Sequence, residues 1–142
     1  MDVNQKRLEN VLDTKITGPI GLSVSQASDV EMTLVNAGDT AIAEFADWTV
    51  IFEVQKASGF DVEYLAYTSS ASPSAGEWTV KGIYFDAATL SAEVIDPGTF
   101  NPGEEMIVRA NPTTALVANT YDRATFATPN GVGAKVIFKV VP

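Results

Sequence analysis

Pairs of neighbouring carboxylates are the side chains in this sequence with the clearest capacity for acid–base chemistry. Three pairs occur along the chain, at Asp29/Glu31, Asp61/Glu63 and Glu104/Glu105. A glycosidase needs two carboxylates that face each other across a cleft, one of them with a raised pKa. Residues two apart on a strand share a face, so each such pair could act together. However, the solvent-facing positions of alternating strands commonly carry charged side chains without any catalytic role. We therefore expect surface charge here, and no enzymatic activity.

The composition excludes most other chemistry. The 142 residues include no cysteine and no histidine, and 18 Asp and Glu against 9 Lys and Arg give a net charge of -9. Without Cys and His there is no disulfide framework, thiolate nucleophile, Ser-His-Asp triad or ordinary zinc site. The acid excess argues against nucleic acid and against anionic membrane surfaces. No phosphate-binding glycine loop is present, so no cofactor is expected.

One turn region has the oxygen ligands that calcium prefers. Asp96, Asn101 and Glu104 cluster there, next to two Pro-Gly turn signals. Calcium takes six to eight oxygen ligands, and the sequence has no loop of the D-x-[DN]-x-[DN]-G type. Asp and Asn before Pro-Gly also initiate turns by themselves. We favour the turn interpretation and keep weak Ca²⁺ binding as the alternative.

Aromatic residues flank a small polar loop at residues 68–76, which we expect to be exposed and mobile. Tyr64, Tyr67 and Trp78 are candidate contacts for a partner protein or a glycan, because exposed aromatic side chains bind both. The alternative for Trp78, as for Trp48, is packing in the core, since each begins an alternating strand, and we favour it. The odd spacing of Tyr64 and Tyr67 requires one of them to point outward.

The elements that would position these residues are predicted to be strands. Apolar residues alternate with polar ones through 30–34, 48–54, 62–66, 78–84 and 132–140, with turn clusters between them. Seven to nine short strands predict an all-β fold, an antiparallel β-sandwich of immunoglobulin type, with a closed barrel as the alternative. Residues 1–16 are expected to form an N-terminal helix stub or stalk, and residues 17–142 the single β-sandwich domain.

Several segments resemble a known family. Residues 34–42, LVNAGDTAI, resemble the V-x-N-x-G-x-T-x-I strand–turn–strand segment of archaellin-type proteins, and residues 45–52 are similar to the strand that follows in them. Residues 78–80 and the segment 100–108, with its Asn-Pro-Gly-Glu turn, resemble their later half. These are archaeal flagellins, the related archaellum stator proteins and bacterial homologues. The resemblance covers residues 17–141.

The resemblance implies a type IV pilin-like organisation. In the family, a class III signal peptide precedes a hydrophobic N-terminal helix, and a β-sandwich head follows. This sequence shows no such helix, so we expect that Met1 replaces it and that residues 2–14 are the end of the stalk. Any membrane attachment would then run only through the missing helix. The full parent sequence tests this expectation, and light scattering of the head at several pH values tests whether the head dimerises.

The implied function is non-enzymatic. It is that of a structural domain of a cell-surface filament, either a flagellin-like subunit or an associated stator protein, located outside the cell. The implied partners are other copies of the chain, filament subunits or a cell-envelope layer protein. The alternative function is an extracellular carbohydrate-binding or adhesion module that uses Tyr64, Tyr67 and the 68–76 loop.

Overall fold

The computed structural model describes residues 14–27, 29–93 and 96–142. The predicted helix over residues 2–14 therefore lies outside the described residues, except for Thr14. Ile16, which we assigned to the helical stalk, belongs to the first strand and is buried in the core. Within the described residues, no helix has the length and apolar composition needed to cross a bilayer.

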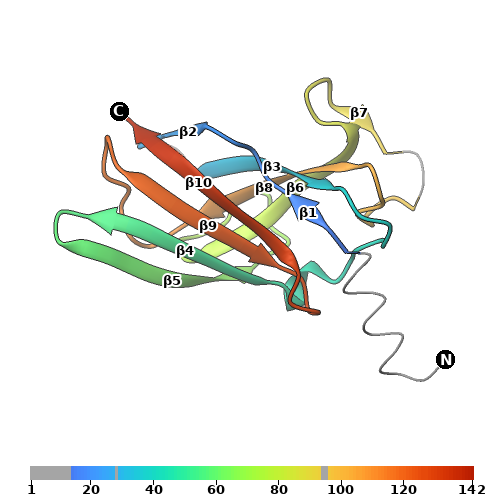
Figure 1. Ribbon diagram of the computed structural model, residues 1–142, viewed down its shortest axis with the longest axis horizontal. Coiled ribbons are helices and arrows are strands. Elements are labelled where there is room, and N and C mark those ends of the chain that lie inside the picture. The colour runs from blue at the N-terminus through green and yellow to red at the C-terminus, as the bar shows by residue number, and fades with distance from the viewer. Residues whose placement is uncertain (1–13, 28, 94–95) are drawn as a thin grey trace.

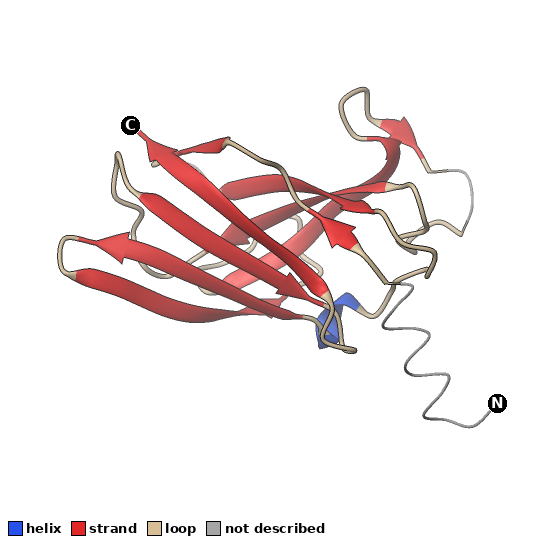
Figure 2. Cartoon of the chain, in the orientation of Figure 1, coloured by secondary structure: helices blue, strands red, loops and turns tan. Residues whose placement is uncertain are grey.

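Nearly all regular structure in the described residues is strand, and a short 3-10 turn, η1, spans Phe45–Asp47 (Figure 2). The strands are β1 (Ile16–Thr17), β2 (Leu22–Ser25), β3 (Val30–Asn36), β4 (Thr49–Lys56), β5 (Gly59–Tyr67), β6 (Glu77–Asp86), β7 (Ser91–Ala92), β8 (Glu105–Asn111), β9 (Tyr121–Ala127) and β10 (Gly133–Val141).

The strands form two facing layers (Figure 1). The first sheet has the order β1-β3-β8-β6, and the second sheet has the order β5-β4-β9-β10-β2. A short parallel pairing of Ala66 and Tyr67 with Glu77 and Trp78 joins β5 to β6, so the layers are one curled sheet at that side. This order corresponds to strands A-B-E-D and C′-C-F-G-A′ of immunoglobulin domains. The prediction of an all-β, sandwich-like fold is confirmed.

The chain changes sheet between its first two strands. β1 pairs antiparallel with β3, whereas β2 pairs parallel with β10 at the edge of the second sheet. This parallel pairing and that of β5 with β6 depart from the purely antiparallel prediction. Gly18 lies at the crossing point, where a Cβ atom would overlap the side chain of Val136. Only glycine lets the backbone pass this close to β10.

The core lies between the two sheets and consists of the inward positions of alternating strands. In β10, Ala134, Val136, Phe138 and Val140 are buried, as the alternation predicts. Trp78 is fully buried at the centre. Its ring lies 5.3 Å from that of Tyr67, 5.8 Å from that of Phe126 and 6.0 Å from that of Trp48, measured between centroids. The contacts with Tyr67 and Phe126 are edge-to-face, and such contacts stabilise the core beyond the burial of aromatic area alone.

The two turn motifs that carry the family resemblance meet in space. The side chain of Asn36 is buried, and its Nδ2 donates to the carbonyls of Thr40 and Phe100, each at 2.9 Å. The backbone N–H of Gly103 donates to the carbonyl of Asn36 at 2.8 Å. Glu104 accepts the N–H of Asn101 at 2.7 Å and closes the second turn. These motif residues therefore have a structural role that accounts for their presence.

Candidate functional site

The carboxylates of the predicted acid–base pairs are engaged in structural contacts. Glu31 bridges two strands of the first sheet, because it accepts from Arg109 Nη2 at 2.8 Å and from Lys81 Nζ at 3.1 Å. Burial raises the pKa of Glu31, but the hydrogen bonds from Lys81 and Arg109 outweigh it and hold that pKa below its ordinary value. A carboxylate held ionised by two cations is a structural anchor rather than a general acid.

The second pair is partly exposed, as expected of surface charge, but it lies on the inner side of β5. Asp61 and Glu63 point to the inner side of β5, where they hold the loop that follows β8. Glu63 accepts the N–H of Thr113 at 2.7 Å, and Asp61 accepts the hydroxyl of Thr114 at 2.9 Å. Asp61 also pairs with Lys56 at 3.0 Å. Charges on the inner side of an exposed strand discourage pairing with other chains.

The third pair is also used by the fold. Glu105 accepts the N–H of Ala87 at 2.8 Å, and Glu104 closes the Asn101 turn described above. Among the residues that the structure describes, no three acidic side chains are grouped so that they could hold a metal ion. Weak Ca²⁺ binding near Asp96 stays an untested prediction.

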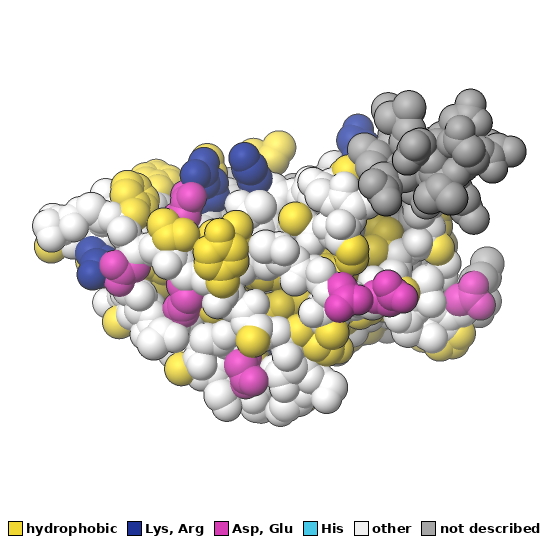
Figure 3. Space-filling model, turned by 90° about the horizontal axis from the view of Figure 1, so that it is seen from below, with side chains coloured by type: hydrophobic (Ala, Val, Ile, Leu, Met, Phe, Trp, Pro, Cys, Tyr) yellow, Lys and Arg dark blue, Asp and Glu magenta, His cyan; other side chains and the backbone are white. Residues whose placement is uncertain are grey.

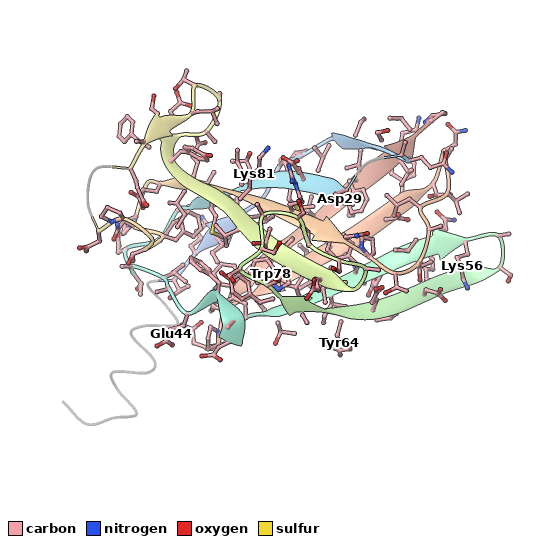
Figure 4. All side chains as sticks on the ribbon, turned by 180° about the vertical axis from the view of Figure 1, so that it is seen from behind. Asp29, Glu44, Lys56, Tyr64, Trp78 and Lys81 are labelled. Atoms are coloured by element: carbon pink, nitrogen blue, oxygen red, sulfur yellow. The ribbon has the colours of Figure 1, made fainter. Side chains whose placement is uncertain are left out.

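The three aromatic residues proposed as partner or glycan contacts have different environments. Tyr64 is 71% exposed on the outer side of β5, whereas Tyr67 turns inward and packs edge-on against Trp78. One tyrosine therefore points outward, as the odd spacing requires. Figure 4 shows Tyr64 projecting away from β5 and Trp78 lying between the sheets. A surface contact through Trp78 is incorrect, because a fully buried ring presents no area to a partner.

The polar loop at 68–76 is anchored to the first sheet. Asn111 Nδ2 donates to the carbonyl of Pro73 at 3.1 Å, and Arg109 Nη1 donates to the carbonyl of Ala71 at the same distance. The N–H of Gly76 donates to the carbonyl of Asn111 at 2.7 Å, and Pro73 is buried. Most residues of the loop are exposed, as expected, but these hydrogen bonds attach it to the first sheet.

The structure instead brings together an exposed apolar surface on the outer side of the second sheet. On β5, Phe60 and Val62 are 60% and 61% exposed beside Tyr64, although the alternation suggested that this apolar side would face the core. The inner positions are occupied by Asp61 and Glu63. β5 pairs with β6 only through its last two residues, Ala66 and Tyr67, so the first sheet does not cover the earlier part of β5.

This surface continues across the neighbouring strands. Val62 pairs with Glu53 on β4, Glu53 with Arg123 on β9, and Arg123 with Ile137 on β10, which makes one row across four strands. Tyr121 is 56% and Ile137 61% exposed, and Ile20 before β2 is fully exposed. We call the set Ile20, Phe60, Val62, Tyr64, Tyr121 and Ile137, with the charged residues among them, the outer face.

Two shallow hollows lie on the outer face and share Tyr121 and Ile137 in their walls. One, of about 500 Å³, also includes Phe60 and Val62, and the other, of about 440 Å³, includes Ile20. Contiguous apolar surface of this kind marks interaction sites on soluble proteins. Figure 3 shows hydrophobic and basic side chains gathered along the upper left of the view from below.

The charges on the outer face are mainly basic. Arg123 donates to Glu53 at 2.6 Å, and this hydrogen bond holds the pKa of Glu53 below its ordinary value. Lys135 and Lys139 point to the same side of β10 as Ile137, and within the described residues neither forms an ion pair. The outer face therefore offers two unpaired ammonium groups beside its apolar centre.

Sequence reasoning missed Phe60, Tyr121 and Ile137 as surface residues. One signal was present in β10, where Ile137 interrupts the solvent-facing positions between Lys135 and Lys139. A large apolar residue at a solvent-facing position of an alternating strand has two explanations. Either the inward side of the strand was assigned wrongly, or the residue belongs to a contact surface. For Phe60, the sequence held no such signal, because hydrophobicity alone assigns Phe60 and Val62 to the core side of the strand.

No protein-family model matches this sequence, and no curated protein matches it. Among solved structures, the fold is similar to the archaellum periplasmic stator protein FlaG from Sulfolobus acidocaldarius, with a TM-score of 0.57 and 22% identity. That alignment covers 88% of this chain and 99% of the FlaG chain. A chain in the complex of FlaF and FlaG from the same organism gives the same TM-score and identity, with 89% of that chain covered. The chain therefore has the β-sandwich fold found in these stator proteins.

Proposed function

We propose that this chain is a non-enzymatic structural domain associated with an archaellum-type surface filament. The observation that carries the proposal is the likeness to FlaG over almost the whole domain. The turn motifs at residues 34–42 and 100–104, which resemble those of archaellin-type proteins, agree with it. Those motifs meet in the fold through Asn36 and Gly103. The use of the paired carboxylates as structural anchors supports a role without catalysis.

Of the two archaellum roles, we favour the stator-like one over that of a filament subunit. The two solved structures named above are of archaellum periplasmic stator proteins, and one of them is a complex of two different proteins, FlaF and FlaG. By analogy, this domain lies on the outer side of the cell membrane and binds other archaellum subunits or an envelope protein. In this proposal, a hydrophobic anchor on the N-terminal side of the domain attaches it to the membrane.

A gene deletion in the source organism tests the proposal. We expect deletion to abolish swimming, as measured by cell tracking, and expression of the full-length wild-type gene to restore it. Electron microscopy of the same cells shows whether surface filaments are still assembled, which separates a stator from a subunit. A deletion strain that swims normally and has normal filaments would contradict the proposal.

The exposure of Tyr64 favours one alternative of a different class, an extracellular carbohydrate-binding module. Glycan recognition through stacked aromatic rings would require Tyr64, with Tyr121 and Phe60 on the same face. Titration of the purified domain with soluble polysaccharides tests this function. Binding that is lost in Tyr64→Ala but kept in Phe85→Ala would favour the glycan module, because Phe85 is equally exposed on β6.

A further inference from the structure

We propose that the outer face docks a second, acidic protein through an apolar centre and a basic rim. This inference rests on the proposed function, because it names the surface and the chemistry of the partner through which the domain would act. The apolar centre is Val62, Tyr121 and Ile137, and the rim includes Lys135 and Lys139. The proposed partner presents apolar side chains opposite the centre and carboxylates opposite the lysines.

The apolar centre is held in place by the pairing of four strands. Ile137 and Val62 lie at the two ends of one cross-strand row, and Tyr121 lies in the adjacent row on β9. Strands lie about 4.8 Å apart and the two rows about 6.8 Å apart, so the three apolar residues span roughly 14 by 7 Å. A standard interface covers about 800 Å² per partner, with its strongest contacts at an apolar, aromatic centre. The outer face therefore supplies an apolar centre that contains an aromatic ring, with Lys135 and Lys139 on its β10 side.

The charge of the outer face differs from that of the rest of the chain. The outer face holds Arg123, Lys135 and Lys139, three of the nine basic residues in a chain of net charge -9. Among the described residues on this face, Glu53 is the carboxylate present, and Arg123 neutralises it. A basic island on an acidic protein orients an acidic partner and speeds its association.

The same charges argue against other occupants. Two copies that met through this face in a symmetric dimer would bring together two surfaces with the same basic excess, which is unfavourable. An anionic membrane would repel a chain that is acidic elsewhere. A glycan would gain stacking from Tyr121 and Phe60 but little from the aliphatic Val62 and Ile137.

Site-directed photocrosslinking of the full-length protein in its source cells tests the proposal. Tyr121→p-benzoylphenylalanine places the photoreactive ring on the outer face, and Phe85→p-benzoylphenylalanine places it at a similarly exposed position on the first sheet. We expect one dominant adduct with a different protein from position 121, identified by mass spectrometry, and no such adduct from position 85. An adduct of the chain with itself or with lipid, or equal adducts from both positions, would overturn the proposal.

Binding of the purified partner then tests the chemistry. We expect Lys139→Glu to weaken binding about tenfold at 0.1 M salt, with a smaller difference at 0.5 M, because salt screens the rim charges. The matched variant Lys15→Glu removes the same charge near β1 and should bind like the wild type. Equal affinities of Lys139→Glu and wild type would overturn the proposal.

The outcomes separate this inference from the proposed function. An acidic partner that crosslinks at position 121 but belongs to no filament or envelope assembly would support the docking face and refute the archaellum role. An archaellum partner that crosslinks only at position 85 would support the archaellum role and refute the docking face.

Discussion

Asp122 offers a sharp test of the structure, because it is a carboxylate placed on the core side of β9. The residue is only 2% exposed, and its Oδ1 accepts the N–H of Gln55 at 2.8 Å. Burial raises the pKa of Asp122 above its ordinary value of 3.8, and the hydrogen bond from Gln55 offsets only part of this effect. The folded protein therefore disfavours the ionised form that exists at neutral pH.

The sign of the pH dependence follows from this raised pKa. Between pH 3.8 and the raised value, the folded state binds more protons at Asp122 than the unfolded state does. The contribution of Asp122 to stability therefore falls as the pH rises through this window, and the loss is complete above it. Asp122→Asn removes the charge and keeps an oxygen that can accept from Gln55.

The expected result is that Asp122→Asn is more stable than wild type at pH 7. A buried charged group with incomplete compensation costs about 1–3 kcal/mol, and Asn retains part of the polar cost, so we expect a gain of about 1 kcal/mol. For a chain of this length, that gain raises Tm by about 3 °C. Urea unfolding at several pH values measures the difference, which should shrink toward zero near pH 3.

The matched control is Asp29→Asn, which neutralises an exposed carboxylate outside the core. It should change stability by less than about 0.5 kcal/mol at every pH. The carboxylates with lowered pKa are present in both the wild type and Asp122→Asn, so their effects cancel in the difference. If Asp122→Asn is no more stable than wild type at pH 7, with no trend down to pH 3, the reasoning about burial is refuted.

Four further substitutions test other parts of the fold. Glu31→Gln should lower the free energy of unfolding by about 0.5–1 kcal/mol at pH 7, because two partly exposed ion pairs are lost. The lowered pKa of Glu31 means that this contribution is present above its ordinary pKa of 4.5 and disappears as the pH falls, so urea titrations at pH 3 should show little difference. Gly133→Ala should destabilise by about 2 kcal/mol or more in thermal melts, because the new Cβ overlaps the carbonyl of Phe126. Trp78→Ala should cost about 3–5 kcal/mol, while Tyr64→Ala should stay within about 0.5 kcal/mol of wild type.

Each of these expectations has a contradicting result. A Glu31→Gln effect that persists at pH 3 would mean that charge is not its source. A Gly133→Ala variant with an unchanged Tm would show that Gly133 does not lie as close to the carbonyl of Phe126 as it does in the structure. Similar losses for Trp78→Ala and Tyr64→Ala would contradict the assignment of one ring to the core and the other to the surface.

The sequence was sufficient to predict those strands in which nearly all apolar residues fall on one side. In β10, all apolar residues but Ile137 and Val141 fall on one side, so the alternation predicts both the strand and its inward face. Trp78 and the turn at Asn36 were predictable for similar reasons, since alternation and turn chemistry act locally. The relation between the two turns was not, because it depends on strands that are distant in the chain.

The candidate site was less predictable because it depends on which side of a strand is covered. Phe60 and Val62 alternate with Asp61 and Glu63, and hydrophobicity alone assigns the apolar pair to the core. In the fold, β5 extends beyond the first sheet, and its inner acids bind the loop at Thr113 instead. The sequence pattern gives the period of a strand but not the extent of the sheet that covers it.

The most direct test of the account is face-specific complementation of the deletion strain. Ile137→Asp places a charge at the centre of the outer face, at a position that is 61% exposed, so the domain should still fold. Thr33→Asp places the same charge on the outer side of β3 in the first sheet. With equal amounts of folded protein in the cells, the account predicts that Thr33→Asp restores swimming and Ile137→Asp does not. Full restoration by Ile137→Asp would contradict it.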